Sequence, residues 1–160
     1  MMFSSPGHPH LTIKDESSIA SSIPPTKTER PYILAVDDNW SVLSTLMSLL
    51  ESDGYSCVCI AESQWVLPFL QEMGKRGEKH LPSLLLLDLM MPVVSGYDIA
   101  RWLSAHEPYN QIPVLVITAD ARVRDRRDVP GAQDILLKPF QIDVLLTLVE
   151  HFLAPLLGRS

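Results

Sequence analysis

The chain has 160 residues, of which 46% are hydrophobic, and a formal net charge of −6 at pH 7. This composition is typical of one globular domain with a full core and a tail of about 30 residues. The acidic balance argues against a dedicated nucleic-acid binder, which usually carries a basic face. Since no apolar run could span a bilayer and the amino terminus lacks the features of a signal peptide, we expect a cytoplasmic protein that does not contact membranes.

The first 30 residues are rich in serine and proline, and their few charges cancel. They show no apolar periodicity, so residues 1–30 are expected to form a disordered tail that adds nothing to the fold. Residues 31–156 are expected to form the single folded domain.

From Tyr32 onward, short apolar runs alternate with segments of helical periodicity. We expect strands at residues 32–36, 55–61, 84–88, 113–118 and 135–137. We expect helices at about residues 42–50, 63–73, 97–105, 121–129 and 142–153, with a polar loop at 74–80. Strands that are separated by helical crossovers pair in parallel, with helices on both faces. The pattern therefore predicts an α/β fold with a doubly wound parallel sheet.

Two cysteines, Cys57 and Cys59, lie one residue apart in the second expected strand. Alternate residues of a strand project from the same face, so we interpret both as small core residues. A strained local disulfide or half of a metal site is the alternative, although no second Cys/His pair completes a zinc set.

Polar side chains follow four of the expected strands. Asp37 and Asp38 end the first, Asp88 the third, Thr118 the fourth and Lys138 the fifth. The carboxyl ends of parallel strands lie at one edge of a sheet, so these residues can converge in one cleft. Three carboxylates together repel each other, and hard oxygen ligands suit Mg²⁺. A lysine and a hydroxyl opposite them could hold the oxygens of a phosphoryl group.

This set resembles the receiver domain of two-component response regulators, in its CheY-like, stand-alone form. The motifs that carry the resemblance are Asp37-Asp38, Asp88 with Met91-Pro92 and Gly96, Thr118-Ala119, and Lys138-Pro139-Phe140. The resemblance covers residues 31 to about 155. It implies the flavodoxin-like (βα)5 fold with strand order 2-1-3-4-5.

The resemblance also implies the function of the site. Asp88 would accept a phosphoryl group from the phosphohistidine of a sensor histidine kinase or a histidine phosphotransfer protein. Mg²⁺ would be held by Asp37, Asp38, Asp88 and the backbone carbonyl of Met90. Lys138 would pair with the phosphoryl oxygens, and Thr118 would sense them. The phosphorylated domain would signal through a downstream protein partner, and its only catalysis would be phosphoryl transfer to itself and slow autodephosphorylation.

Three features depart from the family pattern. Ile135 stands where the family usually has an aromatic switch residue. The spacing from Thr118 to Lys138 is about two residues short, which would trim the fourth helix, and the loop at 74–80 is longer than usual. The first two departures concern the output rather than the phosphorylation chemistry.

Other interpretations are a constitutive interaction module and a fragment of a larger regulator, which would have the same sequence. A phosphatase or phosphotransferase of the haloacid-dehalogenase type needs a second acid two residues after the nucleophile, where Met90 stands. Four arginines at 122–127 alternate with acids, leaving an excess of one positive charge. We expect these residues to form a solvated helix face, with a partner-docking face as the alternative.

Overall fold

The computed structural model describes residues 12–13 and 31–157. The described strands are β1 (Thr12–Ile13), β2 (Tyr32–Val36), β3 (Ser56–Ile60), β4 (Leu84–Leu87), β5 (Val114–Thr118) and β6 (Ala132–Leu137). They form one parallel sheet in the order β1-β3-β2-β4-β5-β6. Apart from β1, this is the 2-1-3-4-5 order of the flavodoxin-like fold, so the predicted fold class is confirmed.

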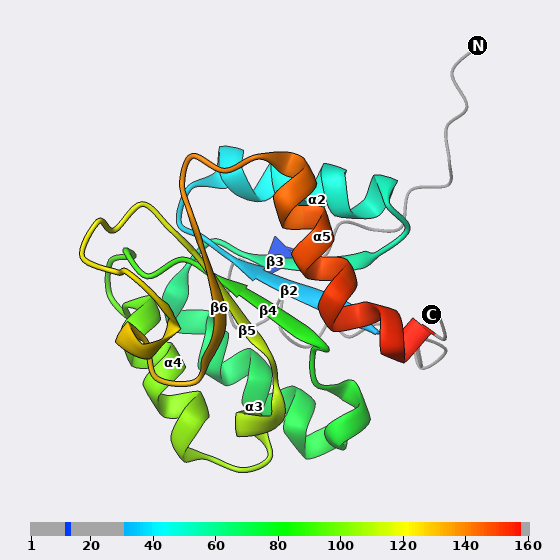
Figure 1. The fold of residues 1–160 in the computed structure, drawn as a ribbon. Coiled ribbons are helices and arrows are strands. Elements are labelled where there is room, and N and C mark those ends of the chain that lie inside the picture. Colours follow the sequence, from blue (N-terminus) through cyan, green and yellow to red (C-terminus); the bar gives the residue numbers. More distant parts are fainter. Residues whose placement is uncertain (1–11, 14–30, 158–160) are drawn as a thin grey trace.

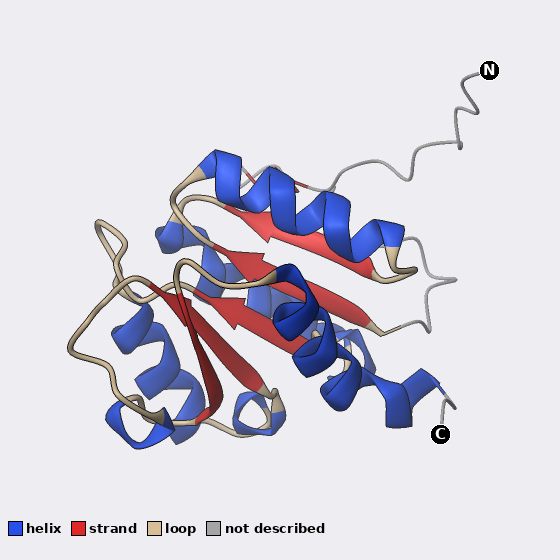
Figure 2. Ribbon diagram, turned by 45° about the horizontal axis from the view of Figure 1, so that its top comes forward, coloured by secondary structure: helices blue, strands red, loops and turns tan. Residues whose placement is uncertain are grey.

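Helices cover both faces of the sheet. The α-helices are α2 (Trp40–Ser52), α3 (Val66–Arg76), α4 (Gly96–Ala105) and α5 (Ile142–Leu153). Helices α2 and α5 lie on one face, and α3 and α4 lie on the other (Figures 1 and 2). Short 3-10 turns follow or connect them: η1 (Ser63–Trp65), η2 (Glu78–His80), η3 (Tyr109–Gln111), η4 (Arg126–Asp128) and η5 (Ala154–Leu157). The segment expected as a loop at 74–80 therefore holds the last turn of α3 and η2.

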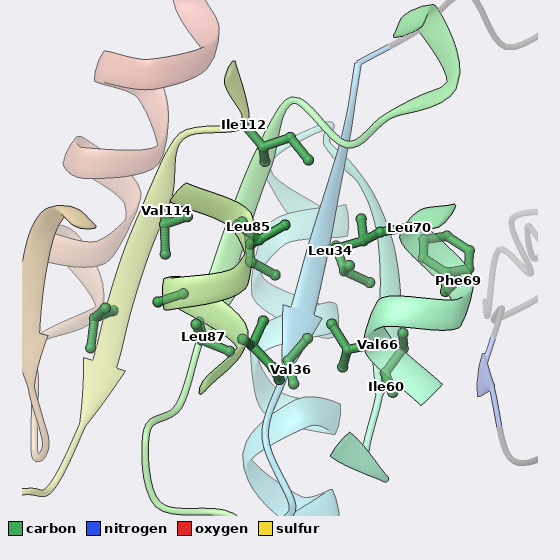
Figure 3. Close-up of a cluster of buried hydrophobic side chains, with 14 of the residues drawn as sticks. Leu34, Val36, Ile60, Val66, Phe69, Leu70, Leu85, Leu87, Ile112 and Val114 are labelled. Atoms are coloured by element: carbon green, nitrogen blue, oxygen red, sulfur yellow. The ribbon is translucent and has the colours of Figure 1, made fainter. Parts of the chain in front are cut away.

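The core is divided into two layers by the alternation of side chains along each strand. Leu34 and Leu85 point toward α3 and α4, where they join the cluster shown in Figure 3. Ile33 and Leu84, one residue earlier on the same strands, pack in the layer beneath α2 and α5. Because both faces are buried, the central strands are continuous hydrophobic runs, as is typical of parallel sheets.

Strand β1 contradicts part of the expectation for residues 1–30. Thr12 and Ile13 pair with Cys59 and Ile60 at the edge of β3. Ile13 is only 1% exposed and belongs to the α3/α4 layer of the core. The expectation that this segment adds nothing to the fold is wrong for these two residues, because a two-residue strand has no periodicity to detect and gains its stability from tertiary contacts. The rest of the expected tail lies outside the described residues.

The helix expected at residues 121–129 is also wrong. The connection between β5 and β6 contains only the 3-10 turn η4. Val123 and Val129 are its only buried apolar side chains, which is too little burial to stabilise a short helix. Gly131, at a φ of 76°, ends the segment, and β6 begins three residues before the expected strand.

Acidic side chains in this connection bond to the backbone in place of helical hydrogen bonds. Asp125 Oδ1 accepts the N–H of Arg127 at 2.8 Å, and Asp128 Oδ2 accepts the N–H of Arg124 at 2.7 Å. Aspartate commonly competes with helix formation in this way. The alternation of arginine and aspartate therefore belongs to a hydrogen-bonded loop and not to a helix face.

The two cysteines are buried and free. Their Sγ atoms lie 3.9 Å apart, and both belong to the α2/α5 layer of the core, as predicted. The hydrogen bond with Cys59 and burial raise the pKa of the Cys57 thiol. Within residues 12–13 and 31–157, no helix has the length and apolar character needed to cross a membrane.

Candidate functional site

Three carboxylates meet at the carboxyl edge of the sheet. Asp37 and Asp38 follow β2, and Asp88 follows β4. Each offers an oxygen, and these oxygens lie within 4.8 Å of one another. Asp37 and Asp88 are buried, whereas Asp38 is exposed. In the described part of the chain, this is the only group of three or more histidine, cysteine or acidic side chains close enough to share a metal ion.

Backbone hydrogen bonds continue the sheet up to these acids. The N–H of Asp88 donates to the carbonyl of Val36 at 3.0 Å, and that of Asp37 donates to the carbonyl of Ile60 at 3.3 Å. The two buried carboxylates are therefore fixed by the register of β2, β3 and β4. This dependence on sheet pairing explains why residues 51 positions apart in the sequence lie together.

One oxygen of each buried carboxylate faces a local backbone donor. Asp37 Oδ1 accepts the N–H of Asn39 at 2.8 Å, and Asp88 Oδ1 accepts the N–H of Met90 at 3.2 Å. These bonds orient the carboxylates and leave their Oδ2 atoms for other partners. The Asn39 side chain in turn caps α2 by accepting backbone N–H groups of its first turn.

Lys138 provides the positive charge of the site. Its Nζ donates to Asp37 Oδ2 at 2.6 Å and lies 3.7 Å from Asp88 Oδ2. The backbone of Lys138 is held at the same edge, because its N–H donates to the carbonyl of Thr118 at 2.8 Å. Thr118 is fully buried, and its hydroxyl accepts the N–H of Asp120 at 3.2 Å.

The charges do not balance within the site. Burial and the neighbouring Asp37 raise the pKa of Asp88, while Lys138 and the N–H of Met90 act in the opposite direction. Three carboxylates face one ammonium group, so the site retains an excess of negative charge. A hard divalent cation with oxygen ligands would offset this excess, so the donor set fits Mg²⁺. The side chain of Met90 is exposed, and its backbone lies two residues after Asp88 along the loop.

Gly96 allows the loop after Asp88 to turn tightly. A Cβ atom at this position would lie 2.6 Å from the Cα of Leu89 and still closer to the carbonyl oxygen of Asp88. The N–H of Gly96 donates to the carbonyl of Leu89 at 3.0 Å, which closes the loop at its base. Only glycine fits this approach.

A second polar cluster beside Thr118 was not identified from the sequence. The carboxylate of Asp120 is buried and accepts a hydrogen bond from the Tyr97 hydroxyl at 2.8 Å. Arg122 donates to the same carboxylate through Nε at 2.9 Å and through Nη2 at 2.8 Å. These bonds with Arg122 hold the pKa of Asp120 well below its usual range. The position of Asp120, two residues after Thr118, was the signal in the sequence for a link between the site and this loop.

A parallel sheet with three acids and a lysine at its carboxyl edge has the architecture of CheY-like proteins. Residues 33–150 match the family model for the response regulator receiver domain. The chain therefore belongs to the response regulator receiver domain family.

Individual relatives agree with this assignment. The chain is 26% identical over 123 residues to the polar-differentiation response regulator DivK of Brucella ovis, which covers 76% of this chain and 94% of that protein. The structure of a receiver domain of a signal transduction histidine kinase from Syntrophus aciditrophicus is 28% identical, with a TM-score of 0.65 and coverage of 79% and 92%. A receiver domain of a sensor histidine kinase from Pseudomonas aeruginosa is 25% identical, with a TM-score of 0.61 and coverage of 78% and 98%. In that structure a magnesium ion is coordinated in the active-site cleft.

Proposed function

We propose that this domain is the phosphoacceptor of a two-component phosphorelay. Asp88 takes a phosphoryl group from the phosphohistidine of a sensor histidine kinase or a histidine phosphotransfer protein, and the domain then signals through contacts with a downstream protein. The observation that carries the proposal is the buried Asp88 carboxylate beside Asp37 and Lys138, in a chain that belongs to the receiver family. The cytoplasmic location expected from the sequence stays a prediction.

Asp88 Oδ2 is the nucleophilic atom in this proposal. Oδ1 is engaged by the N–H of Met90, whereas Oδ2 lies on the side of Lys138. A new bond forms between Oδ2 and phosphorus as the bond from phosphorus to the histidine nitrogen breaks, and the electron pair of that bond stays on the imidazole. Phosphoryl transfer needs mainly in-line positioning and stabilisation of charge, which a fixed carboxylate and an adjacent lysine supply.

Lys138 and Thr118 respond to the new group. The phosphorylated aspartate adds about 1.5–2 negative charges to the site. Lys138, which is bound to Asp37 in the unmodified protein, lies close enough to Asp88 to pair with a phosphoryl oxygen. The Thr118 hydroxyl can donate its proton to another oxygen while its own oxygen still accepts the Asp120 N–H.

Asp37, Asp38, Asp88 and the backbone carbonyl of Met90 would hold Mg²⁺. When bound, the ion supplies positive charge that stabilises the carboxylates and the transferring phosphoryl oxygens. The excess of carboxylates over ammonium groups in the site supports this assignment. The phosphoryl group ends on Asp88 of the domain itself, so we do not propose turnover of a separate substrate.

Labelling with a small phosphodonor tests the proposal. We expect phosphoramidate to phosphorylate the protein in the presence of Mg²⁺ and to fail when the ion is chelated. Asp88→Ala should abolish labelling, whereas the matched control Asp98→Ala, which removes an exposed carboxylate from α4, should label as the parent does. Undiminished labelling of the Asp88→Ala protein would exclude Asp88 as the acceptor.

A constitutive interaction module is the second candidate. Ile135 favours it, because this half-buried residue on β6 has neither the ring nor the hydroxyl of the usual aromatic switch residue. Capture of a partner with and without beryllofluoride, which mimics the phosphoryl group, separates the two functions. A phosphorylation-dependent receiver should bind its partner differently in the two conditions, and a constitutive module should not. An aspartyl phosphatase is not proposed, because Met90 stands where that chemistry needs an acid.

A further inference from the structure

The loop between β4 and α4 contains a strained turn. Val93 has a φ of 70°, in the left-handed region that a β-branched residue rarely adopts. Its side chain is 82% exposed, so its own packing does not hold this conformation. Strained backbone persists only where surrounding contacts maintain it, and the contacts must therefore come from neighbouring residues.

Ser63 provides these contacts from a different crossover. It is the first residue of η1, after β3, and is only 3% exposed. Its hydroxyl donates to the carbonyl of Pro92 at 2.7 Å and accepts the N–H of Val94 at 3.1 Å. The same N–H lies 2.9 Å from the Pro92 carbonyl. One buried hydroxyl thus engages the backbone on both sides of Val93.

The turn belongs to the loop that carries the site. Asp88 immediately precedes this loop, and the N–H of Met90 donates to the Asp88 carboxylate at 3.2 Å. The base of the loop is closed by the hydrogen bond from Gly96 to Leu89. The two hydrogen bonds to Ser63 hold the loop at Pro92 and Val94. Loss of the Ser63 hydroxyl would therefore free the segment between Met90 and the turn.

We propose that Ser63 is a positioning residue for Mg²⁺ binding and phosphoryl transfer. Its hydroxyl holds Val93 in the left-handed conformation and thereby fixes the backbone of Met90 next to Asp88. Without the hydroxyl, Val93 relaxes toward an ordinary φ and shifts the residues between it and Asp88. The inference rests on the proposed function, because it assigns Ser63 a part in the same site.

The test compares Ser63→Ala with Ser104→Ala in the full chain. Ser104 is a matched control, since its exposed hydroxyl also donates to a backbone carbonyl, that of Arg101, at 2.8 Å. In Ser63→Ala, we expect faster hydrogen exchange at the Val94 amide without metal, and Mg²⁺ affinity by calorimetry about tenfold weaker. Phosphoramidate labelling at saturating Mg²⁺ should slow by a similar factor. Ser104→Ala should retain the parent values.

A second substitution separates positioning from a general loss of structure. Glycine adopts positive φ without strain, so Val93→Gly in the Ser63→Ala background should recover most of the lost Mg²⁺ affinity. Parent affinity and parent labelling in Ser63→Ala would overturn the inference, and so would a loss that Val93→Gly leaves unchanged. If the parent protein is not labelled at Asp88, the proposed phosphoacceptor function fails. The Mg²⁺ affinities and the Val94 exchange still decide the role of Ser63 in that case.

Discussion

The ammonium group of Lys138 lies 2.6 Å from Asp37 Oδ2 and 3.7 Å from Asp88 Oδ2. The lysine therefore binds Asp37 more closely than it binds Asp88, the proposed acceptor. In the proposed function, this arrangement leaves Asp88 Oδ2 without a hydrogen bond from the lysine and keeps the ammonium group close to the charge that a phosphoryl group would add.

Lys138→Met should separate the contribution of this lysine to stability from its contribution to phosphoryl transfer. Methionine preserves much of the aliphatic volume but leaves Asp37 and Asp88 without their cation, and breaking one partner of a largely buried ion pair is destabilising. In metal-free buffer at pH 7, we expect a thermal midpoint at least about 4 °C lower, measured by circular dichroism. Mg²⁺ should recover part of this loss, whereas labelling at Asp88 should remain slow even when Mg²⁺ saturates the site. An unchanged midpoint together with parent labelling would contradict both roles.

Asp88 itself should destabilise the metal-free domain at neutral pH. Burial and Asp37 raise its pKa in the folded state, so the stabilising contribution of the protonated form is present at acidic pH. It is lost as the pH rises through the folded pKa. Asp88→Asn removes this dependence and should raise the thermal midpoint at pH 7 by about 2–4 °C.

The higher thermal midpoint of the Asp88→Asn variant should disappear toward pH 3, where the Asp88 carboxyl of the parent is protonated and therefore uncharged, like the asparagine side chain. The same substitution at the exposed Asp98 provides the control and should not produce this pH-dependent gain. A stabilisation of Asp88→Asn that is equal at pH 3 and pH 7 would show that titration of Asp88 is not its cause.

From strand β1 we expect residues 12–13, which precede the expected domain, to contribute to stability. Ile13 is 1% exposed in the core, so Ile13→Ala should cost about 2 kcal/mol, or a decrease of roughly 4–8 °C in the thermal midpoint. The control is Ile142→Ala, at an isoleucine that is 46% exposed. A midpoint for Ile13→Ala within about 1 °C of the parent would mean that β1 adds no stability in solution.

The parallel sheet, and polar residues gathered at its carboxyl edge, could be predicted because they depend on local patterns, whereas the strand order was implied by the resemblance to the receiver family. The apolar runs around Leu34 and Leu85 identify buried strands of a parallel sheet. The acids that follow these strands and the lysine that follows the edge strand β6 share the carboxyl edge of the sheet. Ile13 and Ser63 could not be found in this way. Their roles depend on partners far away in the sequence, at β3 and at Pro92, and no local periodicity marks them.

The prediction of a helix at residues 121–129 was wrong for a different reason. The segment has a suitable length and ends at a proline and a glycine, so helical spacing could be fitted to it. The hydrogen bonds of Asp125 and Asp128 to nearby N–H groups instead favour turns, and only two apolar residues are available for burial. The absence of this helix bears directly on how the domain can transmit a signal.

The last prediction concerns that signal. Thr118 is connected through the N–H of Asp120 to a carboxylate that binds the Tyr97 hydroxyl at 2.8 Å. A shift of Thr118 toward a phosphoryl group would therefore pull on the contact between the β5–β6 loop and α4. Ile135, which is β-branched and has restricted rotation at its first torsion, can report little by changing rotamer. We expect beryllofluoride to change hydrogen exchange most in residues 119–131.

Tyr97→Phe tests this connection because it removes the hydroxyl that anchors the loop while retaining the ring. The loop should exchange faster before activation, and the additional change on adding beryllofluoride should become smaller than in the parent. Ile135→Val, the matched control on β6, should leave the response of residues 119–131 unchanged. If beryllofluoride instead leaves those residues unaltered in the parent while Ile135 adopts a new rotamer in paired structures, output proceeds through β6 and the loop has no part in it.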